Sequence, residues 1–120
     1  MLTRRRFLAA SISGLAAAVL PAFAGAQVVD KPVRIVVGFP AGGPTDAIAR
    51  IIADKLRSKY ASTIIVDNKA GAAGRIGIEN GKAGPADGSG MLMTPVSLMV
   101  VYPFVYKKLV YDALKDFVPV

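Results

Sequence analysis

Two segments of this chain repeat one order of elements: an apolar run rich in β-branched residues, a glycine-rich turn and a helical pattern. The first apolar run covers residues 33–39 and the second covers 63–67, while a third, at 91–94, follows another turn cluster. Strands that alternate with helices in this way form a parallel sheet with right-handed crossovers. The sequence therefore predicts an α/β fold with a mostly parallel sheet of about three or four strands and flanking helices.

The helix expected after the first turn is marked by apolar residues that lie three and four positions apart. Such spacing is typical of one face of a helix. These residues are Ile48, Ile51, Ile52 and Leu56. Pro44 suits the first helical position, and Asp46 lies where a carboxylate meets the positive helix end. We expect Asp46 to be structural, since its charge would repel an anionic ligand, and Arg50 to form a solvated pair with Asp54.

The segment after the second apolar run is rich in small residues. Gly71, Gly74 and Gly77 put hydrogen atoms where side chains would stand, so the backbone can closely approach a ligand, a strand or a packed helix. Arg75 suits either contact with an anion or a surface position at a helix start, and the sequence leaves both open. Residues 96–101 fit a short helix and a strand equally well.

The first 26 residues are typical of an export signal rather than of a folded body. Three arginines at 4–6 precede a mildly apolar stretch, and small residues before Gln27 fit signal peptidase, whose cleavage we place after Ala26. The Arg4-Arg5 pair resembles a twin-arginine signal, with Sec export or a membrane anchor as the alternatives. The sequence thus predicts export to the periplasm, with residues 27–120 remaining after processing.

The composition excludes several functional classes. The chain contains no His and no Cys, which removes Ser-His-Asp and Cys-His catalysis, disulfides and the commonest metal ligand. Residues 38–43 resemble a phosphate loop but lack the Lys-Ser/Thr pair that nucleotide binding requires. Three of the fifteen basic residues lie in the signal, so the net charge falls from +7 to +4, too small to indicate a nucleic-acid partner. We expect no enzyme and no cofactor.

Three strand-to-helix loops are candidates for a ligand site. They cover residues 40–45, 68–74 and 94–97, and each is rich in Gly, Ala, Thr, Ser or Asn. In an open parallel sheet such loops gather beyond the carboxyl ends of the strands, where ligands bind. Exposed backbone N–H groups and helix N-termini favour anions. The sequence therefore predicts an anion site at one edge of the sheet. A tight turn without a ligand is the alternative for the first loop, and a close-packing surface is the alternative for residues 71–74.

Four blocks, taken in order, carry a family resemblance. They lie at 32–46 with Ala49-Arg50 following, at 66–77, at 86–88 and at 111–120. Together they closely resemble tripartite tricarboxylate transporter receptors, also called Bug-type solute-binding proteins. The resemblance implies a periplasmic-binding-protein type II-like fold, in which two α/β domains enclose a cleft. It also implies capture of a small carboxylate (a di- or tricarboxylate, an acidic amino acid or an aromatic acid) and its delivery to membrane permease subunits.

The resemblance also implies which residues hold the ligand, through backbone N–H groups, hydroxyls and bridging water. Carried over position by position, they are Ala41, Gly42 and Thr45 in the first loop, Gly71, Ala72 and Ala73 in the second, and Thr94 and Ser97 in the third. The third loop departs from the family, because Pro95 and Val96 stand where an Asn-Gly-like pair is common.

Receptors of this family are much longer than this chain. We therefore expect residues 27–120 to be the N-terminal part of the first solute-binding domain, incomplete and without the second domain. Because half a cleft cannot close on a ligand from both sides, we expect residues 27–120 to bind carboxylates weakly or not at all. The alternative is a truncated, non-binding relic or an interaction module that a partner chain completes, because unpaired sheet edges and uncovered apolar faces drive association.

Overall fold

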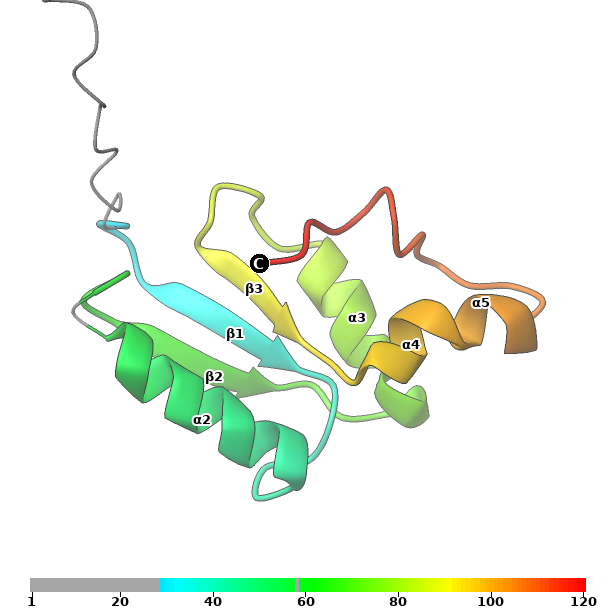
Figure 1. Ribbon diagram of the computed structural model, residues 1–120, viewed down its shortest axis with the longest axis horizontal. Helices are drawn as coiled ribbons and strands as arrows, with labels where there is room; N and C mark the ends of the chain where they lie inside the picture. The colour runs from blue at the N-terminus through cyan, green and yellow to red at the C-terminus, as the bar shows by residue number, and fades with distance from the viewer. Residues whose placement is uncertain (1–28, 58) are drawn as a thin grey trace, which may run out of the picture.

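A parallel three-stranded sheet organises the computed structural model, which describes residues 29–57 and 59–120 (Figure 1). Strands β1 (Val33–Val37), β2 (Ile64–Asn68) and β3 (Gly90–Met93) lie in the order β2-β1-β3. Both neighbours of β1 run parallel to it, which confirms the predicted α/β fold with a parallel sheet. The expected export signal at 1–26 lies outside the described residues.

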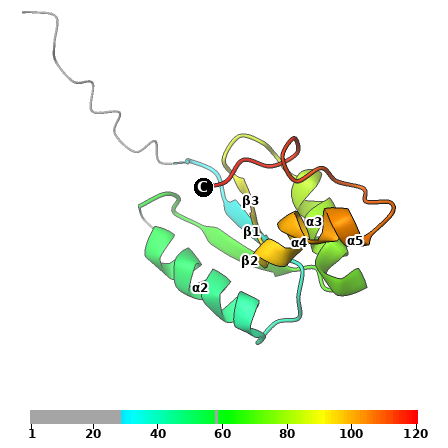
Figure 2. The ribbon, with the colours of Figure 1, turned by 45° about the vertical axis from the view of Figure 1, so that its right-hand side comes forward.

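Helices cover both faces of the sheet. Helix α2 (Pro44–Leu56) connects β1 to β2 on one face, and the 3₁₀ turn η1 (Ala72–Gly74) with α3 (Arg75–Lys82) connects β2 to β3 on the other. Figure 2 shows α2 on one side of the sheet, with α3, α4 (Val96–Val100) and α5 (Tyr102–Val105) on the other. Of the two conformations that the sequence allowed for residues 96–101, helix and strand, the structure shows a helix, α4. Within the described ranges, no helix is long and apolar enough to cross a membrane.

The apolar core is divided between the two faces of the sheet. On the α2 side, the buried side chains are Val33, Ile35, Val37, Ala49, Ala53, Ala61 and Ile64. On the α3 side, Ile78, Leu98 and Tyr111 form a second buried group. The Tyr111 hydroxyl donates a hydrogen bond to the Leu98 carbonyl, which joins the C-terminal segment to α4. Lys82 of α3 also holds this segment, because its ammonium group lies 2.7 Å from the Asp116 carboxylate.

The predicted helix is confirmed, but its three isoleucines do not face the sheet. Ile48, Ile51 and Ile52 are 52%, 61% and 37% exposed, whereas Ala49 and Ala53 are buried against the sheet and Leu56 is partly buried. One residue of an α-helix corresponds to a rotation of about 100°. The buried face is therefore displaced by about one residue from the isoleucine face. The reason is that Ala49 and Ala53 pack closely on the strands and the buried Asp46 has hydrogen-bond partners on that side (see below). The apolar spacing identified the helix but not the side that faces the sheet.

Glycines bring the start of α3 against the end of β1. A Cβ atom at Gly77 would lie 2.3 Å from the Gly38 Cα atom, and one at Gly38 would lie 2.7 Å from the Gly74 carbonyl oxygen. Both distances are far below a van der Waals contact, so this approach requires glycine. The close approach expected at Gly74 and Gly77 is therefore made to the backbone of the neighbouring strand end.

Candidate functional site

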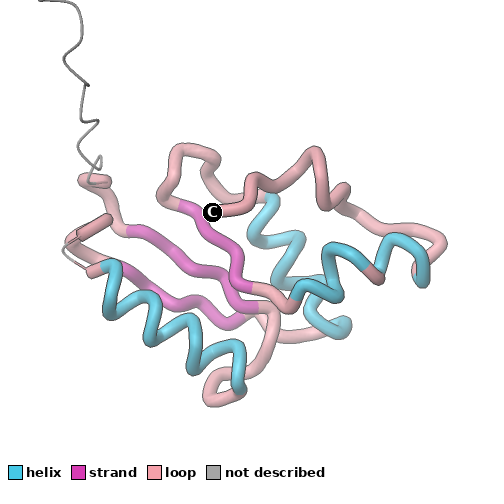
Figure 3. Tube along the Cα trace, viewed as in Figure 1, coloured by secondary structure: helices cyan, strands magenta, loops and turns pink. Residues whose placement is uncertain are grey.

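The three candidate loops leave the same edge of the sheet, because the strands are parallel (Figure 3). We call this edge the loop edge: it comprises residues 38–43 after β1, 69–74 after β2 and 94–95 after β3. Gly74 lies where the second segment packs against the first segment and against α4. A Cβ atom there would lie 3.0 Å from Cζ of Phe39 and 2.5 Å from Cδ2 of Leu98 in α4. The structure therefore brings the first two predicted loops together and packs the second against α4, the helix that follows the third loop.

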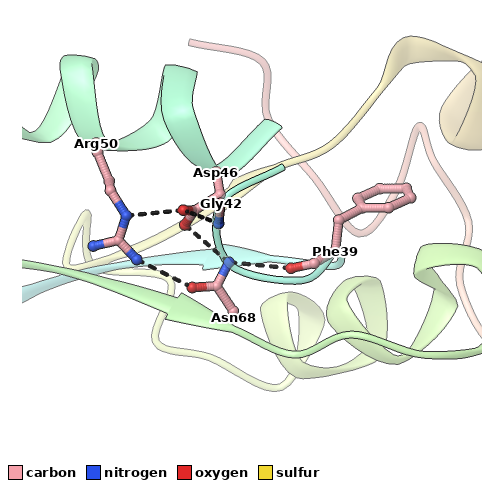
Figure 4. A network of polar contacts seen from close by, with 5 residues as sticks. All are labelled: Phe39, Gly42, Asp46, Arg50 and Asn68. Carbon is pink, nitrogen blue, oxygen red and sulfur yellow. Dashed lines mark hydrogen bonds and ion pairs between the residues drawn. The ribbon is translucent and has the colours of Figure 1, made fainter. Parts of the chain in front are cut away.

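A network around the buried carboxylate of Asp46 fixes the first loop (Figure 4). The Asp46 Oδ2 atom accepts bonds from the Gly42 N–H at 2.8 Å and from the Arg50 Nε–H at 2.9 Å. Its Oδ1 atom accepts a bond of 2.9 Å from the Asn68 amide, which also donates to the Phe39 carbonyl at 3.1 Å. The carboxylate thus joins the loop after β1, helix α2 and the end of β2.

These donors lower the pKa of Asp46 to about 2 from its usual 3.8. The bond from Arg50 is the largest cause, followed by those from the Gly42 N–H and Asn68, and they outweigh the opposing effect of burial. Asp46 is therefore a charged structural residue at neutral pH, in agreement with its expected role. The expected Arg50–Asp54 pair is wrong, because Arg50 bonds Asp46 one turn earlier and Asp54 pairs with Arg57 at 3.0 Å.

The network changes what Gly42 can contribute. Its N–H is taken by Asp46, and its φ of +81° belongs to the left-handed region that favours glycine. The N–H groups of Ala41 and Thr45, by contrast, have no acceptor among residues 29–57 and 59–120. Ala41 is exposed and Thr45 is half-buried. Of the three predicted first-loop residues, Ala41 and Thr45 therefore offer donors and Gly42 shapes the turn.

The second loop adopts a conformation that the sequence did not predict. Gly71, Ala72, Ala73 and Gly74 all have positive φ, at 137°, 48°, 54° and 90°. The Gly74 N–H closes the turn on the Gly71 carbonyl at 3.0 Å. Left-handed backbone is uncommon for alanine, and it persists only where surrounding contacts hold it. In the described part of the chain, the N–H groups of Gly71, Ala72 and Ala73 have no acceptor and form a row of exposed donors.

Side chains from α3 and α5 hold the carbonyl groups of this turn. Arg75 Nε–H donates to the Ala72 carbonyl at 3.0 Å, and the Tyr102 hydroxyl donates to the Ala73 carbonyl at 3.1 Å. The Arg75 guanidinium also lies 4.5 Å from the centre of the Tyr106 ring. Arg75, whose role the sequence left open, therefore turns back onto the loop. Sequence reasoning missed the contact of Tyr102, which lies 29 positions from Ala73, and no local pattern could have revealed it. It also missed the Asp46–Arg50 pair, which the i,i+4 spacing could have indicated, and the long-range contact of Asn68 with Asp46.

The third loop contributes least to the arrangement. The Thr94 hydroxyl is buried and has no hydrogen-bond partner within the described ranges, and it lines a hollow with Leu92 and Phe117. Ser97 is exposed in the first turn of α4. A second, apolar hollow lies between α4–α5 and residues 109–114 and contains none of the predicted ligand residues. No group of three or more metal-ligating side chains occurs among the residues that the structure describes.

Comparison with known proteins identifies related sequences. The sequence model of a family described as "Tripartite tricarboxylate transporter family receptor" matches residues 48–120. A UPF0065 protein of a Pseudomonas species, in the tcbD-tcbE intergenic region, is 40% identical over 98% of this chain and 34% of its own length. Protein BugT of Bordetella pertussis is 35% identical over 75% of this chain and 28% of its own length. The chain thus spans about a third of the length of these relatives.

Solved structures with the same local fold include two that are each at least 30% identical to this chain. MatC from Rhodopseudomonas palustris, with bound malate, is 30% identical and has a TM-score of 0.66 over 73% of this chain and 30% of its own. A second structure, described as a periplasmic transporter, is 35% identical with a TM-score of 0.64 over 70% of this chain and 28% of its own. Both matches cover less than a third of the solved structure.

Proposed function

Because the chain belongs to the tripartite tricarboxylate transporter receptor family, we propose that it helps capture a small carboxylate at the loop edge. Its fold is periplasmic-binding-protein-like, and the family consists of receptors rather than enzymes. The expectation that the chain is not an enzyme agrees with this membership. The proposed place of action is the periplasm, and the proposed recipients of the ligand are the membrane permease subunits of a tripartite transporter.

The observation that carries the proposal is the row of free donors at the loop edge. The N–H groups of Gly71, Ala72 and Ala73 are exposed and without acceptors in the described ranges, and those of Ala41 and Thr45 belong to the neighbouring loop. Successive backbone N–H groups attract an anion. They do not require the planar, bidentate geometry with which an arginine guanidinium binds a carboxylate. A carboxylate is an anion small enough to be held by two or three such groups.

The ligand class is supported by a neighbour of known content. MatC, of similar fold, has bound malate, a dicarboxylate. The buried Asp46 carboxylate accepts three bonds from within the chain and, being ionised, has no hydrogen to donate to a ligand. We propose a small carboxylate for this chain: a di- or tricarboxylate, an acidic amino acid or an aromatic acid. Thr94 and Ser97 are proposed to contact it less directly.

The proposal is tested by titrating the full 120-residue chain with L-malate while amide positions are followed by ¹⁵N NMR. We expect the largest shifts at the amides of Ala41, Thr45, Gly71, Ala72 and Ala73. Dimethyl malate is the matched control, because it keeps the carbon skeleton and removes both charges. Equal shifts with the diester, or shifts confined to residues 106–120, would contradict anion binding at the loop edge.

A second function, an interaction module completed by a partner chain, is favoured by a separate observation. In the described sheet β3 pairs only with β1, which leaves its other edge open. In addition, Phe104 and Leu114 are 89% and 92% exposed. An open edge and large exposed apolar side chains favour association.

Light scattering coupled to gel filtration separates the two functions. An interaction module predicts a dimer or larger species that the double change Phe104→Ser and Leu114→Ser disperses. The matched control is Ile51→Ser, which removes an exposed apolar side chain from the opposite face. A monomer at micromolar concentration would remove the support for self-association.

A further inference from the structure

We infer that Arg75 and Tyr102 are positioning residues that hold the second loop in its left-handed form and so aim its N–H groups toward the ligand. This inference rests on the proposed function, since it assigns a purpose to the loop conformation. Neither side chain is required to touch the ligand. Each acts on one carbonyl group of the turn, Arg75 on that of Ala72 and Tyr102 on that of Ala73.

The geometry of the trans peptide links each held carbonyl to the next N–H. In a planar trans peptide, the C=O of one residue and the N–H of the next point in opposite directions. Arg75 donates to the Ala72 carbonyl from its backbone N–H and from its side-chain Nε–H. The side-chain bond adds to the backbone bond and so helps to fix the N–H of Ala73 on the other side of that peptide plane. Tyr102 holds the Ala73 carbonyl and thereby fixes the N–H of Gly74, which closes the turn on Gly71. One side chain therefore aims a free donor, and the other closes the turn.

The backbone of this turn needs such support. Ala72 and Ala73 have φ of 48° and 54°, a region in which the alanine Cβ approaches the following carbonyl. The flanking glycines adopt positive φ without this penalty, but they also leave the turn free to adopt other conformations. Without contacts from outside the turn, the two alanines would return to negative φ and the row of donors would be lost.

Tyr106 supports the guanidinium rather than the loop. The Arg75 guanidinium lies 4.5 Å from its ring centre, and the rings of Tyr102 and Tyr106 are 4.9 Å apart. A guanidinium over an aromatic face is attracted by the ring electrons. This attraction holds the Arg75 side chain in the position from which its Nε–H donates to the Ala72 carbonyl. The hydroxyl of Tyr106 makes no hydrogen bond within the part of the chain that the structure describes. This difference between the two tyrosines provides a matched pair for the test.

The test compares Tyr102→Phe with Tyr106→Phe in the full 120-residue chain, with L-malate as the probe. Two quantities are measured: the ¹³Cα and ¹³Cβ chemical shifts of Ala72 and Ala73, which report φ, and the malate affinity from amide titration. We expect Tyr102→Phe to move these shifts toward those of ordinary alanine and to weaken malate binding about three- to tenfold. Tyr106→Phe keeps the ring, so both quantities should stay as in the wild type.

Arg75→Lys separates positioning from charge. It keeps the positive charge near an anion but removes the Nε donor and the planar group that stacks on Tyr106. We expect the Ala72 and Ala73 shifts to change and the affinity to fall despite the retained charge. An unchanged affinity would assign Arg75 an electrostatic role and overturn the inference for that residue.

Failure of the inference and failure of the proposed function give different results. If malate shifts no loop amide in the wild type, the proposed function fails, and the positioning role fails with it even where the alanine shifts respond to Tyr102→Phe. If malate binds at the loop edge but Tyr102→Phe leaves the shifts or the affinity unchanged, the positioning role alone is overturned. Thermal unfolding of each variant shows whether the fold is retained.

Discussion

At the scale of single residues, a few contacts decide how the loop edge is built. Asp46 could be predicted as structural from its place at a helix start, but its partner Asn68 lies 22 positions away and no local pattern reveals it. Close backbone approach was predictable for Gly74 and Gly77, whereas the identity of the approaching atoms was not. Sequence alone indicates that a residue is small or charged; the fold decides what lies opposite.

The lowered pKa of Asp46 predicts a pH dependence of stability. Because the folded-state pKa, about 2, lies below the usual 3.8, the charged carboxylate stabilises the fold. That contribution is fully present above the usual pKa and is lost as the pH falls through the folded-state value. We expect Asp46→Asn to unfold at a lower urea concentration at neutral pH, with the deficit shrinking toward pH 2.

The control for this measurement is Asp54→Asn, which changes a 70% exposed carboxylate paired with Arg57. Exposed ion pairs contribute little to stability, so its urea midpoint should stay close to that of the wild type at both pH values. A deficit for Asp46→Asn that is the same at neutral pH and near pH 2 would exclude the charge as its cause.

The contact between Gly77 and Gly38 predicts a large effect from a single methyl group. Gly77→Ala would place a Cβ atom 2.3 Å from the Gly38 Cα atom. Because the clash is with a backbone atom, no side chain can rotate to relieve it. We expect a loss of about 3 kcal/mol in the free energy of unfolding, measured by urea titration. Gly43→Ala is the control, since its Cβ would lie no closer than 3.3 Å to any atom; equal losses would refute the contact.

At the scale of elements, the sequence predicted which segments fold but not always how they face. The order of strands and helices followed from β-branched runs and glycine-rich turns, and it is confirmed. The side of α2 that meets the sheet did not follow from apolar spacing, because Ala49, Ala53 and Asp46 compete with three isoleucines for that position. The left-handed turn at Ala72–Ala73 was beyond prediction, since its supports, Arg75 and Tyr102, come from two later helices.

The orientation of α2 predicts opposite outcomes for neighbouring positions. Ile51 is 61% exposed, so Ile51→Gln should change the free energy of unfolding by less than about 0.5 kcal/mol. Ala49 is fully buried, so Ala49→Leu should overpack the interface with the sheet and cost about 1–3 kcal/mol. Chemical unfolding of both variants checks the orientation. The reverse ranking would mean that the isoleucine face is the buried one.

At the scale of the whole molecule, the chain matches about a third of its relatives' length. Binding proteins of this fold gain affinity when two lobes close on a ligand, because only the closed state makes contacts from both sides. In the proposed function, the loop edge provides one side of those contacts. The expectation that the chain forms only part of a two-domain cleft came from the family resemblance in the sequence. The arrangement of free N–H groups could be described only from the structure.

We therefore expect weak binding by the 120-residue chain itself, with a Kd for L-malate near or above about 1 mM. Isothermal titration measures this directly, with dimethyl malate as the uncharged control. Micromolar affinity would show that the loop edge suffices without a second lobe, and it would overturn the view that closure supplies most of the affinity.

The position of Gly74, in contact with both Phe39 and Leu98, limits how new specificities can arise. A substitution that shifts either the loop after β1 or α4 presses on the second loop through this single α-carbon. Replacing the second loop with that of a relative should therefore fail unless the first loop and α4 are exchanged as well. A protein engineer should accordingly exchange these three segments together or leave all of them unchanged.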